Sequence, residues 1–229
     1  MTRLKLAILI SGRGSNMKAL LEAARDPSFP AQPVLVLSNR PDAKGLETAA
    51  AEGVATLAID HKTFGKDREA FERAMHEQLE AAGVEIIALA GFMRVLTPWF
   101  VNTWKGRMIN IHPSLLPHFK GLDTHQRALA AGHTQHGLSI HLVTPGMDEG
   151  PVILQAAVPV FADDAAEGLA ARVLAAEHLC YPAVLAALAD GHLSLERGVV
   201  WHPAAQLPDP DAAGLLWLSN GPPAAEDHG

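Results

Sequence analysis

Two polar side chains interrupt an apolar run at a point where a strand is expected to give way to a loop. The segment "MINIHPSLLPHFKG" (108–121) places Asn110 and His112 two residues apart, and Pro113 and Pro117 follow. Side chains two apart on a strand point to the same face. An amide donor and an imidazole that share a face at the start of a rigid loop could be catalytic. They could also be two ordinary polar residues at the end of a strand.

A carboxylate further along the chain would complete this set. Asp148 lies in the segment "TPGMDEG", and an aspartate in such a loop is most often a turn former. If it reaches His112, it raises the pKa of the imidazole and fixes the ring orientation. The three side chains then suit acyl transfer through a tetrahedral oxyanion without an enzyme nucleophile. The chain has no G-x-S-x-G elbow and no H-E-x-x-H helix, which argues against a serine hydrolase and a zinc site.

A glycine-rich segment, "ILISGRGSN" (8–16), predicts a strand, a tight turn and a helix that begins near Ser15. Free N–H groups at a helix N-terminus form a natural phosphate site. The dinucleotide fingerprint is only partly met, because Met17 replaces its third glycine and Asn39 replaces the acidic residue that holds a ribose. The segment therefore favours a monophosphate. The alternative is a plain strand-to-helix turn capped by Ser15 or Asn16.

A third segment, "ALAGFMRVLTPWF" (88–100), follows the pattern of a ligand-binding loop. Gly91 comes just after a predicted buried strand and allows close approach of a ligand to the backbone. Apolar side chains then surround Arg94, namely Phe92, Met93, Val95 and Leu96. This mixture suits a flat heteroaromatic ligand with an apolar wall and backbone hydrogen bonds at its edge. The alternative is a core loop that carries a surface arginine.

Alternating elements must position these residues. Short apolar runs predict buried strands over 4–10, 33–38, 54–59, 85–90 and 107–111. Helical patterns lie between them, and the one over 67–82 has Asp67 as its N-cap. This alternation predicts an α/β fold with a mostly parallel sheet flanked by helices.

The second half of the chain has a different pattern. Two strand-like runs, 136–143 and 151–160, are joined by a loop that is too short for a helix, so we expect antiparallel additions to the sheet. A long helix is predicted over 163–189, with Asp164 and Glu167 as a capping box and Pro182 as a kink or break.

The C-terminal end completes the expected organisation. Residues 190–202 predict a small hairpin, and 203–229 are rich in Pro, Ala and Asp. We therefore expect a catalytic domain over 1–202 and a loosely ordered tail over 203–229, from which Leu215, Leu216 and Trp217 could dock.

Composition limits the functional classes. A net charge of −7 argues against nucleic acid as the main partner, and the single cysteine, Cys180, excludes an intrachain disulfide. No apolar run approaches the ~20 residues that span a membrane. We expect a cytoplasmic protein that binds small molecules, without a membrane partner.

Several segments together carry a resemblance to a known family. These are "SGRGSN", "LAGFMRVLTPWFV", "INIHPSLLPHFKGLDTH", "HGLSIHLV", "MDEGPVILQAAVPV" and "AAEHLCYP". In order and in register from residue 4 to about 202, the chain resembles the folate-dependent phosphoribosylglycinamide formyltransferases. The N-x-H-P-S-L-L-P segment marks the wider family of 10-formyltetrahydrofolate-dependent formyltransferases, and the Gly-Ser-Asn loop and the overall length point to the glycinamide ribonucleotide group.

The resemblance implies a Rossmann-like enzyme that transfers the formyl group of 10-formyltetrahydrofolate to the primary amine of glycinamide ribonucleotide, in purine biosynthesis. It implies catalytic roles for Asn110, His112 and Asp148. It implies that the ribonucleotide is bound by Gly14, Ser15, Asn16 and Glu177. It implies folate contacts from Arg68, Phe92, Met93, Arg94, Val95, Leu96, Asn110 and Thr144.

The same resemblance implies 10-formyltetrahydrofolate as co-substrate, no metal, and a monomer or homodimer. Asp123 departs from the histidine of some members, so the role of His125 stays open. One alternative is another acceptor, namely methionyl-tRNA, a sugar-nucleotide amine or water. A second alternative is a non-catalytic nucleotide-binding module, which would leave Asn110, His112 and Asp148 without a role.

Overall fold

The computed structural model describes residues 3–195, 199–202, 205, 207–209 and 214–219. The chain forms two compact units, and each is described by itself. The first comprises Met1–Asn110 and Leu142–Glu149, and the second comprises Ile111–His141 and Gly150–Gly229.

The first unit is built on parallel strands, as predicted. Its strands are β1 (Leu4–Ile10), β2 (Ala31–Ser38), β3 (Thr56–Ala58), β4 (Ile86–Leu89) and the first part of β5 (Met108–His112). β1 pairs in parallel with both β2 and β4, β2 pairs with β3, and β4 pairs with β5. The loops that follow these strands therefore leave from one edge of the sheet.

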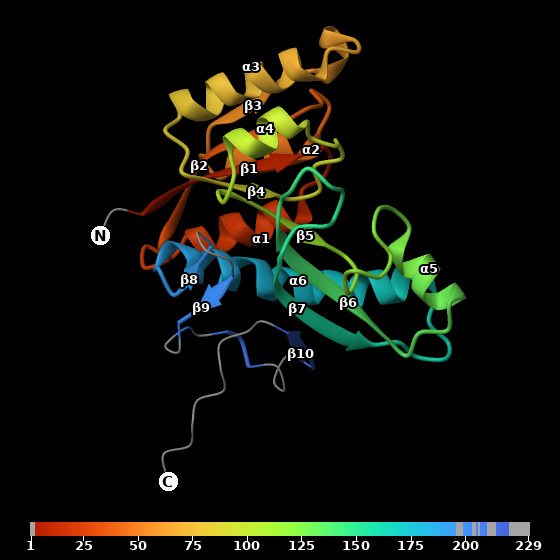
Figure 1. The fold of residues 1–229 in the computed structure, drawn as a ribbon. Coiled ribbons are helices and arrows are strands. Elements are labelled where there is room, and N and C mark those ends of the chain that lie inside the picture. The colour runs from red at the N-terminus through yellow and green to blue at the C-terminus, as the bar shows by residue number, and fades with distance from the viewer. Residues whose placement is uncertain (1–2, 196–198, 203–204, 206, 210–213, 220–229) are drawn as a thin grey trace. The chain divides into compact units, whose positions relative to one another are not determined.

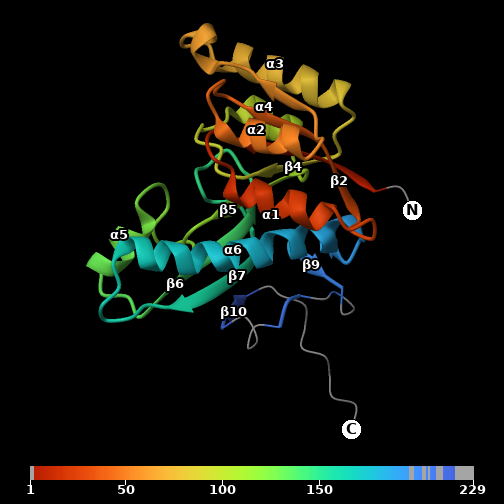
Figure 2. The same ribbon diagram turned by 180° about the vertical axis from the view of Figure 1, so that it is seen from behind.

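Helices cover both faces of these strands. α1 (Ser15–Ala24) and α2 (Lys44–Ala51) lie on one side, and α3 (Arg68–Ala81) and α4 (Pro98–Thr103) lie on the other (Figures 1 and 2). A short 3-10 helix, η1 (His61–Phe64), precedes α3. Alternate strand residues such as Ala7 and Leu9 pack with Phe71 and Trp104 in one core cluster. The predicted cap of α3 is confirmed, because Asp67 accepts a hydrogen bond from the Ala70 amide at 2.9 Å.

The second unit contains the predicted antiparallel strands. β6 (Gln135–Leu142) pairs with β7 (Val152–Pro159), and β10 (Leu216–Ser219) pairs with the other edge of β7. The predicted hairpin is confirmed by β8 (Leu193–Ser194) and β9 (Val200–Trp201). The unit also contains α5 (Thr124–Ala130) and α6 (Ala166–Ala189), and α6 lies along β7 (Figure 2).

The start of α6 differs from the prediction. The helix begins at Ala166, and Ala165 occupies its N-cap without a side-chain hydrogen bond. The predicted capping box is wrong because the Asp164 carboxylate accepts from the Phe161 amide at 2.8 Å and pairs with Arg172 at 2.8 Å. These contacts lower the pKa of Asp164 to about 2. Pro182 lies inside the helix and does not divide it.

Among the described residues, α6 is the one helix long and apolar enough to cross a membrane by length and composition. We expected no such segment from the sequence. Nine of its side chains are buried, and it packs against β7, α5 and β8 within its unit. These contacts are those of the core helix of a folded domain.

The segment 203–229 lies partly outside the described residues. The part that forms β10 is paired with β7, and Leu215 is buried just before it. The division of the chain at residue 202 stays a prediction.

Candidate functional site

The loop after β1 has the geometry of an anion-binding turn. Gly14 occupies the N-cap of α1 with φ 68° and ψ 49°, a left-handed conformation that glycine adopts without strain. Its carbonyl accepts a hydrogen bond from the Lys18 amide at 2.9 Å. The predicted alternative caps, Ser15 and Asn16, are wrong, because both already lie inside the helix. Their amides belong to the first turn, where backbone N–H groups lack helical acceptors.

Direct packing of α2 fixes this loop. The Gly45 amide donates to the Gly12 carbonyl at 3.0 Å. A Cβ atom at position 45 would lie 2.5 Å from Ile10 Cδ1 and 3.0 Å from the Gly12 carbonyl oxygen. Only glycine therefore allows α2 to approach so closely.

A cavity of about 450 Å³ opens at the carboxyl ends of the first unit's strands. It brings together the predicted phosphate residues Gly14, Ser15 and Asn16 with two predicted folate residues, Met93 and Arg94. The other lining residues are Ser11, Gly12, Arg13, Asn39, Arg40, His61, Ala90 and Gly91.

The cavity is electrostatically suited to an anion. Three of its lining residues are arginines, Arg13, Arg40 and Arg94, and Arg40 pairs with Asp42 at 2.6 Å. Sequence reasoning missed Arg13 and His61 as lining residues. The signal was available for His61, because it follows β3 just as Asn39 follows β2, and parallel strands bring such positions to one edge.

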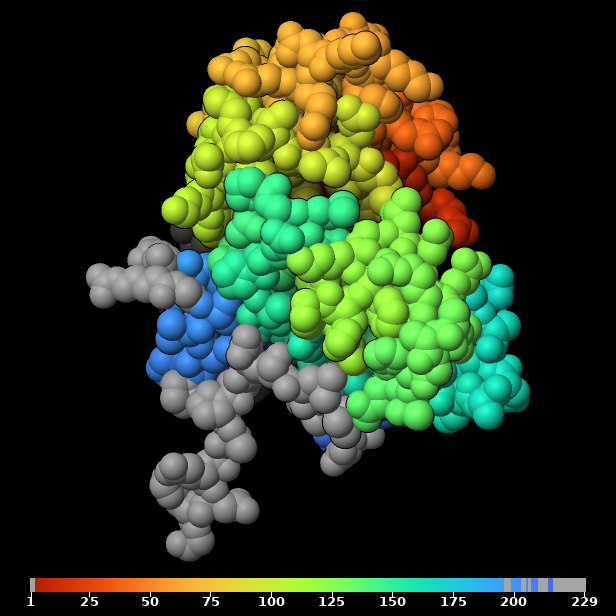
Figure 3. All heavy atoms as spheres, turned by 45° about the vertical axis from the view of Figure 1, so that its right-hand side comes forward, coloured from red at the N-terminus to blue at the C-terminus, as the bar shows by residue number. Residues whose placement is uncertain are grey.

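The segment after β4 combines a fixed backbone with exposed side chains. Met93 and Val95 are 66% and 56% exposed, whereas Leu96 is buried and Phe92 packs partly against the core. Phe92 and Leu96 therefore anchor the segment. Arg68 donates a hydrogen bond to the Val95 carbonyl. In the space-filling view, α3 and the segment around α4 form adjoining parts of one surface (Figure 3).

A buried carboxylate holds the far end of this segment. Glu72 on α3 accepts hydrogen bonds from the Thr97 amide at 2.8 Å and from the Thr97 hydroxyl. Burial raises the pKa of Glu72, and the two Thr97 bonds oppose that shift. Because Thr97 is the N-cap of α4, Glu72 fixes where the loop ends.

Three other predicted site residues belong to the first unit. Asn110 is partly exposed on β5, opposite Leu89 of β4. Asp148 has φ 53°, which agrees with its interpretation as a turn former. Thr144 is partly buried in the same loop. The described residues that line the 450 Å³ cavity do not include Asn110, Thr144 or Asp148.

His112 belongs to the second unit and is buried. Its Nε2 lies 3.1 Å from the Phe119 carbonyl oxygen, so Nε2 carries a hydrogen and donates it. Phe119 itself has φ 53°. This contact fixes the orientation of the imidazole ring.

A neutral histidine pair lies in the same unit. His136 Nε2 is 3.2 Å from His125 Nδ1. Burial, assisted by the neighbouring His125, lowers the pKa of His136 to about 4. Burial and the charge of His112 lower the pKa of His125. Both rings are therefore neutral at pH 7.

Glu177 is buried on α6, close to the single cysteine. Burial and the charge of Glu177 raise the pKa of Cys180 to about 12. A thiol with such a pKa is not a nucleophile at neutral pH. The structure agrees in this respect with chemistry that needs no cysteine nucleophile.

Gly45→Ala should destabilise the first unit by about 1 to 3 kcal/mol, because the added methyl group overpacks the contact with Ile10. The measurement is urea unfolding. Gly12→Ala is the matched control, since its Cβ would meet nothing within 4 Å. Equal stability of the two variants would contradict the close packing of α2 on the loop.

His136 should make stability depend on pH. The pKa of His136 is about 4 in the folded chain, against 6.5 for an ordinary histidine, so the unfolded chain binds more protons between these pH values. The free energy of unfolding should therefore fall as pH drops from 6.5 to 4, by up to about 3 kcal/mol. His136→Gln should flatten this slope in urea unfolding at several pH values, whereas the exposed His202→Gln should not. An unchanged slope in His136→Gln would refute the assignment.

Known proteins with similar sequences and structures agree with one another. Residues 4–185 match the family model described as formyl transferase. Phosphoribosylglycinamide formyltransferase from Escherichia coli (strain K12) is 43% identical over 205 residues, which cover 90% of this chain and 96% of that protein. The trifunctional purine biosynthetic protein adenosine-3 from Drosophila melanogaster is 46% identical over 191 residues, covering 82% of this chain and 14% of that protein.

A solved structure extends the match to the fold. Glycinamide ribonucleotide transformylase 1 from Symbiobacterium toebii is 42% identical, with a TM-score of 0.83, and the match covers 87% of this chain and 94% of that one. The family model covers most of the chain, and the Escherichia coli relative is matched over nearly its whole length. The chain therefore belongs to the formyl transferase family, on the branch of the phosphoribosylglycinamide formyltransferases.

Proposed function

We propose that this protein transfers the formyl group of 10-formyltetrahydrofolate to the primary amine of N1-(5-phosphoribosyl)glycinamide. The products are formylglycinamide ribonucleotide and tetrahydrofolate, in de novo purine biosynthesis. The observation that carries the proposal is the near full-length match to phosphoribosylglycinamide formyltransferase. The cavity beside the Gly14 turn supports it, because it offers cationic side chains and helix N-terminal amides to a phosphate.

In the proposed reaction, the substrate amine attacks the formyl carbon and the carbonyl oxygen becomes negative. Asn110 and protonated His112 stabilise this oxyanion. The Nε2–H of His112 donates to the Phe119 carbonyl, and this hydrogen bond orients the imidazolium ring. Collapse of the tetrahedral intermediate breaks the bond to the folate nitrogen.

Asp148 has two proposed roles. Its negative charge stabilises the imidazolium of His112. It also assists a water molecule that carries the proton from the attacking amine to the leaving nitrogen, so that charge balances over the reaction. The neutral state of His125 and His136 supports the assignment of positive charge to His112, because neither adds a second like charge.

The proposed binding residues fall into two groups, one for the ribonucleotide and one for the folate. Gly14, Ser15 and Asn16 hold the ribonucleotide phosphate, and Glu177 holds the ribose hydroxyls. The folate contacts are Arg68, Phe92, Met93, Arg94, Val95, Leu96, Asn110 and Thr144. Phe92 and Leu96 act by anchoring the segment, because they pack in the core of the first unit.

The remaining parts of the proposal concern the whole protein. The reaction needs no metal, because the charge on the oxyanion is met by Asn110 and His112. We infer a cytoplasmic protein that acts as a monomer or homodimer, without a nucleic-acid or membrane partner.

The direct test is the absorbance change of the folate on mixing with glycinamide ribonucleotide, compared with a sugar-nucleotide amine, methionyl-tRNA and water as acceptors. Faster turnover with a rival acceptor would refute the assignment.

Ser15→Asp should abolish binding of glycinamide ribonucleotide, because a carboxylate in the first turn of α1 repels the phosphate dianion. Folate binding, centred on Met93 to Leu96, should change little. Calorimetric titration of each ligand into wild type and variant is the measurement. Intact ribonucleotide binding, or equal weakening of both ligands, would remove the phosphate role from this loop.

Asp148→Asn should fold normally and lose at least ~100-fold in turnover, since the near-isosteric change removes the charge that keeps His112 protonated. Asp123→Asn is a matched control, because Asp123 also has a left-handed backbone, with φ 57° against 53° for Asp148. Steady-state kinetics of both variants decide the matter. Near-full turnover in Asp148→Asn would exclude the proposed role.

A further inference from the structure

One serine hydroxyl connects the phosphate-binding loop with the segment after β4. Ser11 is the first residue after β1, and its Oγ accepts a hydrogen bond from the Met93 amide at 2.7 Å. The same hydroxyl donates to Asn39 Oδ1 at 2.5 Å. The Ser11 amide also donates to the Gly91 carbonyl at 3.1 Å. The hydroxyl and the amide of Ser11 therefore both hold the segment that carries Met93, and the hydroxyl also binds Asn39.

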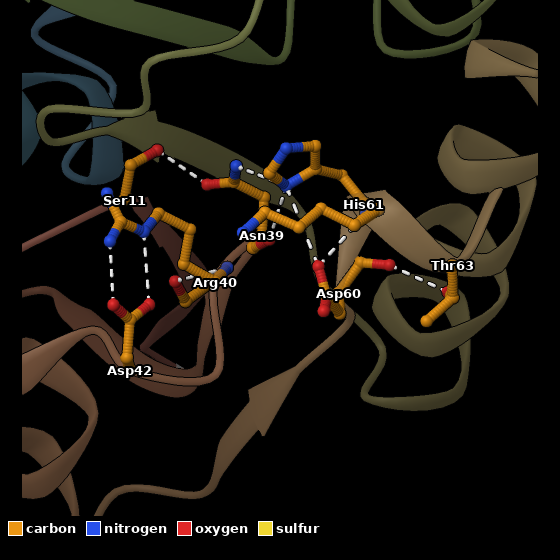
Figure 4. Close-up of polar contacts among 9 residues, drawn as sticks. Ser11, Asn39, Arg40, Asp42, Asp60, His61 and Thr63 are labelled. Carbon is orange, nitrogen blue, oxygen red and sulfur yellow. Dashed lines mark hydrogen bonds and ion pairs between the residues drawn. The ribbon is translucent and has the colours of Figure 1, made fainter. Parts of the chain in front are cut away.

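Asn39 is held in turn by His61 (Figure 4). The His61 Nδ1 lies 3.1 Å from Asn39 Nδ2 and 2.8 Å from the Asn39 carbonyl oxygen. Because a carbonyl oxygen only accepts, His61 Nδ1 donates its hydrogen to the Asn39 backbone, and Asn39 Nδ2 lies beside that nitrogen without donating to it. Since the Ser11 hydroxyl has a single hydrogen and gives it to Asn39 Oδ1, the amide group of Asn39 points Nδ2 at His61.

Burial makes this chain of contacts costly to break. Ser11 and Asn39 are only 6% and 2% exposed. Removing the hydroxyl would leave the Met93 amide and Asn39 Oδ1 without their partner, in a place with little access to water. Met93, by contrast, exposes most of its side chain. The residue is therefore fixed by its backbone, and its side chain is left open to solvent.

We propose that Ser11 and Asn39 are positioning residues for folate binding, which set the backbone of the segment that begins at Met93. The inference rests on the proposed function, in which this segment binds the folate. It goes beyond that function because neither residue has a binding role of its own in it. Ser11 fixes the Met93 amide, Asn39 fixes the Ser11 hydroxyl, and His61 fixes Asn39.

This role explains why the end of β2 carries an amide. In dinucleotide-binding folds an acidic residue at this position binds the ribose of the ligand. Here the Asn39 side-chain oxygen accepts from the Ser11 hydroxyl, so it is used inside the protein, and the side-chain nitrogen faces His61. An amide supplies the acceptor that the Ser11 hydroxyl needs, and it does so without placing a charge in this buried position.

The test begins with Ser11→Ala. Its KM for 10-formyltetrahydrofolate should rise about fivefold to tenfold, the effect of one lost hydrogen bond of ordinary strength, with little change in kcat. The affinity for glycinamide ribonucleotide should change less than twofold. Asn39→Leu should raise the same KM, and Asn39→Asp should restore much of it, because a carboxylate still accepts from the Ser11 hydroxyl.

Ser38→Ala is the matched control. Ser38 is buried one residue before Asn39, and its Oγ accepts from the Arg40 amide at 3.0 Å, whereas the Met93 amide donates to Ser11. This variant loses a similar hydroxyl-to-amide bond in the same part of the fold. It should leave the KM for the folate unchanged, even where urea unfolding shows a loss of stability.

A second readout is independent of the reaction. Hydrogen exchange of the Met93 amide, followed by NMR in the ligand-free protein, should be at least fivefold faster in Ser11→Ala than in wild type and unchanged in Ser38→Ala. Unchanged exchange and unchanged folate KM in Ser11→Ala would overturn the proposal, as would equal effects of Ser11→Ala and Ser38→Ala. If the Met93 amide exchanges faster in Ser11→Ala as expected, but the wild-type protein does not use glycinamide ribonucleotide, the proposed function would be overturned instead.

Discussion

Parallel pairing of β1 with both β2 and β4 is the constraint on which the first unit depends. Because parallel strands release their following loops at the same edge, this pairing brings together segments that lie far apart in the sequence. Residues 11–16, 39–40, 90–91 and 93–94 all line one cavity for this reason. The residues of each loop need only local geometry, since the sheet supplies their proximity.

The loops at this edge are held by the core on which they rest. Gly45 lets α2 pack against the Gly12 carbonyl, and Glu72 holds Thr97 from the opposite face of the sheet. Burying the Glu72 carboxylate opposes its ionisation, and its hydrogen bonds to Thr97 offset part of that cost. The site thus uses buried polar groups to define the ends of its loops and leaves the side chains between them exposed.

The sequence was informative where a pattern has a local physical cause. The period of the apolar runs predicted the strands, and Asp67 and the glycine turn at residue 14 predicted two helix starts. Asp164 was misread because a capping residue and an ion-pair partner look alike in sequence, and Arg172 decides between them only in the folded chain. His61 was missed as a lining residue for a different reason, because the rule that parallel strands bring their ends to one edge was not applied to the residues that follow β3.

The second unit shows how the placement of charge follows from burial. His136 is buried and His125 is half-buried, and burial lowers the pKa of both rings, which removes positive charge from a poorly solvated place. The His112 ring is held differently, because its Nε2–H donates to the Phe119 carbonyl. Cys180 is kept protonated by burial beside Glu177. In the proposed mechanism His112 stabilises a transient negative charge, and the lowered pKa values of His125 and His136 mean that neither neighbour adds a competing cation.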